Sequence, residues 1–154
     1  MRTMRPFLVA LLVLAVLVTP NAAAAQGPPL HSAVFPPDTG RVRVTDVAVF
    51  RALVDTVTAN LSRLEIHVTT LGPGKAPHPP HRHPHEELMI VRSGTLEVFQ
   101  NGATRRVGPG AVIFEASNEL HGLKNPGPDS TTYVVIRIDP HDLANRSTPP
   151  GERE

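Results

Sequence analysis

The 154-residue sequence contains no cysteine, which excludes disulfide bonds and lipidation on an N-terminal cysteine. It also lacks an excess of charge, since the formal net charge is +1. Without Arg2 and Arg5 in the first 25 residues, 13 Lys and Arg face 14 Asp and Glu, a charge of −1. A near-neutral chain has no bulk electrostatic attraction for nucleic acid or an anionic membrane, so neither is expected as a partner.

The longest apolar run near the start of the chain, residues 7–18, has twelve residues, whereas a membrane-spanning helix needs about 20. Arg2 and Arg5 precede this run, Pro20 ends it, and three alanines at 23–25 follow. This order is typical of a secretory signal peptide, and an uncleaved anchor is the less favoured alternative. We therefore expect residues 1–25 to be a signal peptide and the protein to be periplasmic or extracellular. No stable membrane association is expected after cleavage.

The rest of the chain predicts a single all-β domain at residues 41–144, with no internal repeat. Residues 26–40 are rich in proline and glycine and predict an extended arm, and the tail at 145–154 is predicted to be disordered. Short apolar runs separated by turn residues predict strands at 61–71, 87–92, 95–100, 103–107, 111–114, 119–124 and 131–138. Asn101-Gly102 is a strong hairpin signal.

Two features of these runs bear on packing. Residues 47–57 fit either a short helix or strands, and their valine and threonine content favours strands. Within 61–71 an apolar face alternates with a polar one; the two faces are Leu64, Ile66, Val68 and Arg63, Glu65, His67. Short antiparallel strands with tight turns close into a sandwich, a jelly roll or a barrel. Phe99 and Phe114 are expected to pack in it.

Histidine is abundant: the chain has eight, and four of them lie within residues 78–85. Imidazole and carboxylate groups are common ligands of divalent metals. Residues two apart in a strand share a face, so His81 and His83 can meet on one ion. Four extended residues span about 13 Å, so Glu87 joins them only if the chain folds back. Pro84 lies where that turn is needed.

The other histidines are either further candidate metal ligands or residues that are not expected to bind the metal. His78 lies ahead of the strand and His85 in the turn, so both are expected to face solvent. His121 is the favoured fourth ligand, from a separate strand, and His67 is the substitute. His31 and His141, in the arms, are weak candidates. The alternatives are a solvated Pro/His loop that binds metal loosely and a purely structural His121.

These segments resemble the two motifs of the cupin superfamily, whose members are small jelly-roll barrels. The first motif is a glycine, about five residues, His-x-His, three or four residues, Glu, six residues and glycine. Gly74, residues 81–83, Glu87 and Gly94 fit it, with one extra residue between Gly74 and His81.

The second motif ends in a His, three residues and Asn, with Pro-x-Gly ahead. His121 and Asn125 match this ending, and the glycine-rich turn at 108–110 precedes it. The chain departs from the motif at Ala116, where proline is usual, and at Asn118, where glycine is usual. Asn tolerates a left-handed backbone better than most residues, so the turn should form.

The resemblance covers residues 60–140, with the motifs within 72–125, and implies a jelly-roll β-barrel. It also implies that His81, His83, Glu87 and His121 bind one divalent metal ion, which could be Mn, Fe, Ni, Co, Cu or Zn. Two hypotheses follow. One is a small-molecule metalloenzyme, most plausibly dioxygenase-like but also hydrolase or isomerase, with Glu87 as a ligand that also shuttles a proton. The other is a non-catalytic metal-dependent binding or structural protein.

The sequence identifies no second catalytic constellation. Four further side chains could reach the barrel interior, and parity favours none of them: Arg92, Glu97, Glu115 and Tyr133. By resemblance we also expect a homodimer, with the N-terminal arm as an element that the two copies exchange.

Overall fold

The computed structural model describes residues 27–141. The predicted signal peptide and C-terminal tail lie outside the described residues, as do residues 142–144 of the predicted domain. Every regular element in 27–141 is a β-strand, and therefore this part of the chain holds no helix that could cross a membrane. An all-β antiparallel fold of the jelly-roll type is confirmed.

The nine strands follow one another with short connections. Their bounds are β1 Arg41–Val44, β2 Ala48–Thr56, β3 Leu61–Leu71, β4 Glu86–Ser93, β5 Leu96–Gln100, β6 Ala103–Val107, β7 Val112–Glu115, β8 His121–Lys124 and β9 Thr131–Pro140. The predicted strands at 61–71 and 103–107 coincide with β3 and β6, and the others differ from their predictions by one or two residues at an end.

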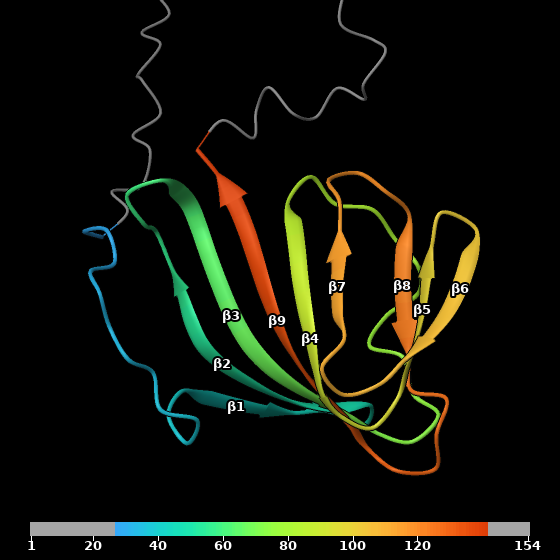
Figure 1. Cartoon of the computed structure of the whole chain (residues 1–154). Coiled ribbons are helices and arrows are strands. Elements are labelled where there is room, and N and C mark those ends of the chain that lie inside the picture. The colour runs from blue at the N-terminus through green and yellow to red at the C-terminus, as the bar shows by residue number, and fades with distance from the viewer. Residues whose placement is uncertain (1–26, 142–154) are drawn as a thin grey trace, which may run out of the picture.

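The strands form two antiparallel sheets. The larger has the order β1-β2-β3-β9-β4-β7, and the smaller has the order β6-β5-β8. In Figure 1 the larger sheet curves from β1 round to β7, and the smaller sheet continues beside β7. β3 pairs with the last strand, β9, so segments that are far apart in the sequence lie side by side in the larger sheet.

Residues 47–57, where helix and strands were both open, form one strand rather than a helix or a strand pair. β2 pairs with β3 along its whole length, and the register shifts between Ala52 and Val54. That irregularity is the reason the apolar spacing resembled a helix, because an extra residue breaks strict alternation. β1, which the sequence did not predict, pairs with β2 at the edge of the larger sheet.

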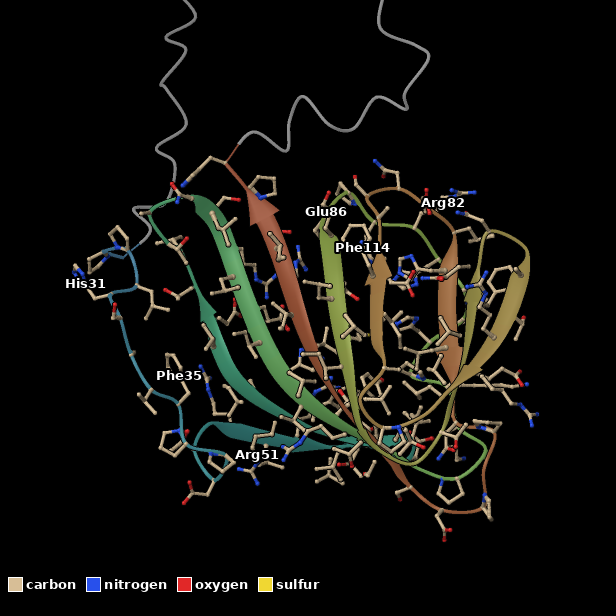
Figure 2. The ribbon with its side chains drawn as sticks, in the orientation of Figure 1. His31, Phe35, Arg51, Arg82, Glu86 and Phe114 are labelled. Atoms are coloured by element: carbon tan, nitrogen blue, oxygen red, sulfur yellow. The ribbon has the colours of Figure 1, made fainter. Side chains whose placement is uncertain are left out.

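The core lies between the two sheets and is built from buried aliphatic side chains and one tyrosine. Its most buried members are Leu71, Leu96, Val91, Met89, Tyr133 and Val98. Because His67 pairs with Val135 and Thr69 with Tyr133, the polar face of β3 points into the barrel, on the core side. Phe114 was expected to pack, but its side chain is 50% exposed on the outer face of β7, where Figure 2 labels it.

Two tight turns have the backbone that their residues predict. Asn101 and Gly102 both have positive φ, 47° and 87°, and join β5 to β6 as the hairpin signal indicates. Asn118 has φ 60°, so the asparagine that replaces the motif glycine adopts the left-handed backbone as expected.

Candidate metal centre

Two distant segments meet at His81 and His121. The amide of His81 donates to the carbonyl of His121 at 2.9 Å, and the amide of His121 donates to the carbonyl of His81 at 3.1 Å. This isolated bridge adds the segment before β4 to the free edge of β8. Gly122 allows the approach, because a side chain there would contact Pro80. The backbone therefore holds the two histidines side by side.

Three imidazole rings converge at this bridge. The ring centroids lie 5.2 Å apart for His81 and His83, 4.8 Å for His81 and His121, and 4.5 Å for His83 and His121. One nitrogen from each ring lies within 4.8 Å of the others. The predicted side-by-side placement of His81 and His83, with His121 brought from a separate strand, is the arrangement found.

The hydrogen bonds of these rings identify the nitrogens that remain free. Nδ1 of His83 lies 2.9 Å from the carbonyl of His85, and Nδ1 of His121 lies 2.9 Å from the carbonyl of Glu119. A carbonyl only accepts, so in the neutral rings each Nδ1 carries the proton and each Nε2 presents a lone pair. Both Nε2 atoms, and Nδ1 of His81, are buried without a partner.

The surroundings of His81 and His83 favour the neutral form of both rings by lowering their pKa values. Burial, followed by the neighbouring charge of His85, lowers the pKa of His83 to about 4. Burial and the nearby His78 and His121 also lower the pKa of His81 below its usual value. A neutral imidazole is the form that binds a metal ion. Three convergent imidazole nitrogens without a hydrogen-bond partner fit a divalent metal.

Glu87 reaches the cluster because the chain bends at Pro84 and His85, as predicted. Its Oε1 lies 3.8 Å from Nε2 of His83 and 3.2 Å from Nε2 of His85. Burial alone would raise the pKa of Glu87, but the hydrogen bond from His85 and the charge of His83 bring that pKa below its usual value. The carboxylate therefore lies close to His83 and His85, and it is not part of the group formed by His81, His83 and His121.

His85 was expected to face solvent, and this prediction was wrong. Its side chain is buried and stacks on the ring of His83, with centroids 3.5 Å apart and planes 6° apart. Its Nδ1 lies 3.8 Å from Oδ1 of Asp139. A signal was present in the sequence, because His85 has the same parity as His83 and Glu87. Because the chain bends at Pro84 and His85, the side chain of His85 points inward with those of His83 and Glu87.

A second carboxyl group, Glu115, lies beside the centre and is one of the four side chains that the sequence indicated as able to reach the barrel interior. It pairs with Glu87 across β4 and β7 and is 2% exposed. Burial raises its pKa, although its Oε2 accepts a hydrogen bond from Gln100. The same oxygen lies 4.0 Å from Nδ1 of His121. Glu115 is thus a buried acid next to one candidate ligand.

The other three side chains that the sequence indicated as able to reach the barrel interior do not all lie inside it. Tyr133 is buried inside, and burial raises its pKa. Arg92 is exposed, and Glu97 forms salt bridges with Lys124 and Arg106 on the outer face of the smaller sheet. Arg92 and Glu97 therefore do not face the centre.

The remaining histidines lie away from the three-ring cluster or on its rim. His78 is exposed, as predicted, with its ring centroid 4.1 Å from that of His81. His67 lies on the cavity wall and its Nδ1 is 3.2 Å from Oε1 of Glu65, so the substitute ligand is not in the cluster. His31 and His141 are exposed.

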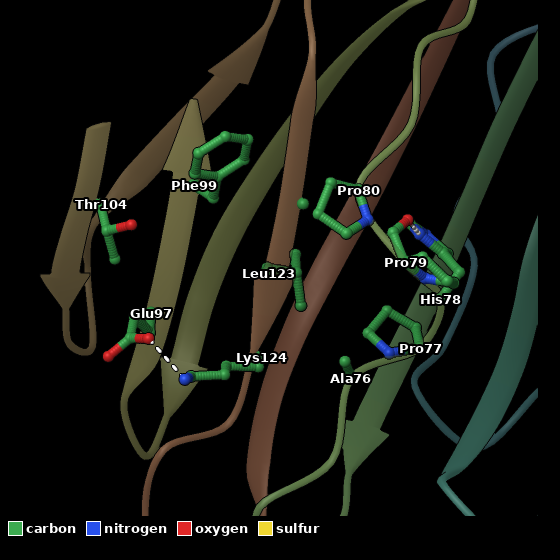
Figure 3. Close-up of a pocket in the computed structure, with 11 residues that line it drawn as sticks. Ala76, Pro77, His78, Pro79, Pro80, Glu97, Phe99, Thr104, Leu123 and Lys124 are labelled. Atoms are coloured by element: carbon green, nitrogen blue, oxygen red, sulfur yellow. Dashed lines mark hydrogen bonds and ion pairs between the residues drawn. The ribbon is translucent and has the colours of Figure 1, made fainter. Parts of the chain in front are cut away.

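A cavity of about 390 Å³ opens onto the centre. Glu87 and His121 lie at its inner end, and Arg43, Phe50 and His67 are among its other lining residues. A larger hollow of about 590 Å³ adjoins this cavity and lies between the proline-rich residues 76–80 and strands β5, β6 and β8. Figure 3 shows that its charged side chains, Glu97 and Lys124, bond to each other. That hollow contains no convergent ligand atoms, so the smaller cavity is the candidate site.

Comparison with known proteins shows what the central part of the chain is similar to. Residues 67–138 match the family model described as the cupin domain. No curated protein sequence matches the chain.

Solved structures share the fold at low sequence identity. The polyketide cyclase RemF from Streptomyces resistomycificus is 23% identical over 71% of this chain and 80% of its own, with a TM-score of 0.58. A predicted oxalate decarboxylase from Thermotoga maritima is 16% identical over 69% and 98%, with a TM-score of 0.57. The cupin domain of Cnp3 from Schizosaccharomyces pombe is 16% identical over 68% and 72%, with a TM-score of 0.57. These similarities establish the fold and not the activity.

Proposed function

We propose that His81, His83, Glu87 and His121 bind one divalent metal ion and that a small molecule binds beside it, and the similarity of residues 67–138 to the cupin domain supports this. The observation that carries this proposal is the convergence of three buried, unpaired imidazole nitrogens within 4.8 Å of one another. The carboxylate of Glu87 lies 3.8 Å from Nε2 of His83, and Glu87 would exchange its hydrogen bond with His85 for the metal ion to complete the set. Mn, Fe, Ni, Co, Cu and Zn all accept such ligands.

The proposed activity is metal-dependent conversion of a small molecule, of dioxygenase, hydrolase or isomerase type. When bound, the metal supplies Lewis acidity and activates an oxygen ligand. The chain's own contribution is a cavity of about 390 Å³ that holds the molecule against the centre. Glu87 lines that cavity as a carboxylate, so it accepts a proton from a molecule bound there.

Elemental analysis tests the ligand set. We expect the wild-type protein to contain one equivalent of metal and the variants His83→Ala, His121→Ala and Glu87→Ala to lose most of it. His31→Ala is the matched control, because that histidine is exposed in the arm. Stoichiometric metal in all three site variants would refute the assignment. Metal retained in His121→Ala alone would point to another group in its place.

The activity needs its own test. Metal-loaded protein is incubated with a panel of diol, quercetin-like and ureide compounds, and we expect turnover that a chelator abolishes. Absence of turnover, together with a ligand-dependent rise in melting temperature, would instead support the non-catalytic binding protein.

Export to the periplasm or the extracellular space remains part of the proposal and is supported by the order of charged, apolar and small residues at 1–25. Mass spectrometry of protein expressed with these residues should find a mature N-terminus at Gln26. Recovery of the intact chain from the cytoplasm would contradict export.

We also propose a homodimer. Ile90, Val112 and Phe114 lie on neighbouring strands of the larger sheet and are 38%, 65% and 50% exposed, an apolar patch on its outer face. Light scattering after size exclusion should give twice the monomer mass. The same measurement on a chain without residues 26–40 tests whether the arm contributes, and a monomer in both samples refutes the dimer.

A further inference from the structure

Strand β1 places two arginines on the concave face of the larger sheet. Arg41 pairs with Ala52 and Arg43 pairs with Phe50, and directly paired residues point to the same side. Ala52 pairs in turn with His67 on β3, a residue of the cavity wall. Both guanidinium groups therefore lie on the face that leads across the sheet towards the histidine cluster.

These two arginines carry charge that the protein itself leaves unpaired. Among residues 27–141, neither forms a salt bridge. The acids of the concave face are engaged elsewhere: Asp55 and Glu65 with Arg63, and Asp139 with Arg137. Two acidic residues line the same cavity as Arg43: Asp46, which is exposed, and Glu87 of the metal centre. Arg43 is the arginine of this cavity, and Arg41 lines the neighbouring hollow.

The wall between the arginines and the centre includes two aromatic rings, Phe50 and His67. The guanidinium of Arg43 lies 4.3 Å from the ring centroid of Phe50. The ring of Phe50 contacts that of His67 edge-on, with centroids 6.2 Å apart. An arginine held over an aromatic ring is a preorganised partner for a carboxylate.

The cavity links these features to the metal centre. One hollow of about 390 Å³ is lined by Arg43 and Phe50 as well as by Glu87 and His121. A second hollow of about 450 Å³, lined by Arg41, shares Arg43, Phe50 and His67 with the first. The first volume lies near the lower end of the range of about 300–1,000 Å³ for small-molecule sites, which suits a compound with one ring.

We propose that the small molecule is an organic acid whose carboxylate binds Arg43, with Arg41 beside it, while oxygen atoms at its other end reach the histidine cluster. This proposal rests on the proposed function, because it concerns the molecule that binds at that centre. It assigns Arg43 as the residue that selects a negatively charged compound.

The test compares 3,4-dihydroxybenzoate with 3,4-dihydroxybenzamide, which has the same shape without the negative charge. Calorimetric titration of the purified full chain should show that the acid binds at least about tenfold more tightly than the amide, the scale of a charge-assisted hydrogen bond. Arg43→Gln should remove this preference and leave the metal content unchanged. Arg92→Gln, an exposed arginine on the outer face of the sheet, should keep it.

Each outcome bears on one proposal. Equal affinities in the wild type, absence of binding, or a preference that persists in Arg43→Gln would overturn the role of Arg43. Elemental analysis of the same samples reports separately on the centre. A wild-type protein without metal would refute the proposed metal centre, while the ratio of acid to amide affinity would still decide whether Arg43 selects the anion.

Discussion

Gly122 offers a way to weaken the metal centre without removing a ligand. It follows His121 in β8, and its hydrogen atoms face the proline before His81. A Cβ atom added at this position would lie 3.1 Å from Cα, 3.2 Å from Cγ and 3.4 Å from Cβ of Pro80. These contacts are closer than ordinary packing allows, so Gly122→Ala must push Pro80 outward by a few tenths of an ångström.

The displacement acts on the centre because Pro80 is bonded to His81, which is held to β8 by two backbone hydrogen bonds of 2.9 and 3.1 Å. Inserting a methyl group into a well-packed site costs about 1–3 kcal/mol. Relaxation moves His81 away from the other two rings, and metal binding must restore it. The affinity loss is therefore bounded by this strain, and we expect about tenfold, or about 1.4 kcal/mol.

The assay is competition for Zn²⁺ between the protein and a coloured chelator, with thermal unfolding of the metal-free protein as a second measurement. The matched control is Gly108→Ala, because Gly108 has no atom within 4 Å of an added Cβ and no positive φ. Gly108→Ala should bind Zn²⁺ as the wild type does. If Gly122→Ala also keeps both wild-type affinity and wild-type stability, the contact with Pro80 does not position His81, and the reasoning fails.

Four further results are expected. Gly94→Ala should lower the free energy of unfolding by roughly 2–5 kcal/mol, because Gly94 has φ 76° and an added Cβ would lie 2.8 Å from Cα of Thr131. Chemical denaturation measures this free energy, and a loss below about 1 kcal/mol would contradict the reasoning. Asn118→Ala should cost about 1 kcal/mol and Asn118→Gly almost nothing, since φ is 60° there; equal losses in the two variants would show that backbone strain is not the cause. Phe114→Ser should give a monomer in light scattering, because it removes an apolar side chain that is 50% exposed, and an intact dimer would place the interface elsewhere. Zn²⁺ at 100 times its Kd should stabilise the wild type by about 2.7 kcal/mol, and an equal gain in His121→Ala would indicate binding outside the centre.

Much of the fold was predictable because it depends on local patterns. Alternation over 61–71 predicted β3, and Asn101-Gly102 predicted the hairpin between β5 and β6. The alternation of apolar and polar residues does not show which face of a strand points into the barrel. The apolar face of β3 would ordinarily be assigned to the core, yet the register places the polar face with His67 towards the cavity. A barrel that holds a polar cavity reverses the usual rule along part of a strand.

The candidate site was predictable where it depends on spacing and not where it depends on packing. His81, His83 and the need for a bend before Glu87 follow from the reach of an extended chain. The burial of His85 does not follow, because it depends on the way the bend turns that ring against His83. The sequence did not favour Glu115 over Arg92, Glu97 and Tyr133 for a similar reason, since Glu87 is brought beside it only by the pairing of β4 with β7.

The distribution of unpaired polar atoms ties the fold to the proposed function. Among residues 27–141, buried side-chain nitrogen and oxygen atoms without a hydrogen-bond partner occur on five residues: Thr69, His81, His83, Glu115 and His121. Each such atom costs about 1–3 kcal/mol when nothing binds it. Three of them are the convergent imidazole nitrogens, and Glu115 lies beside His121. A fold selected only for stability would replace these side chains with apolar ones, so their concentration at one point is the expected cost of a site that a ligand completes.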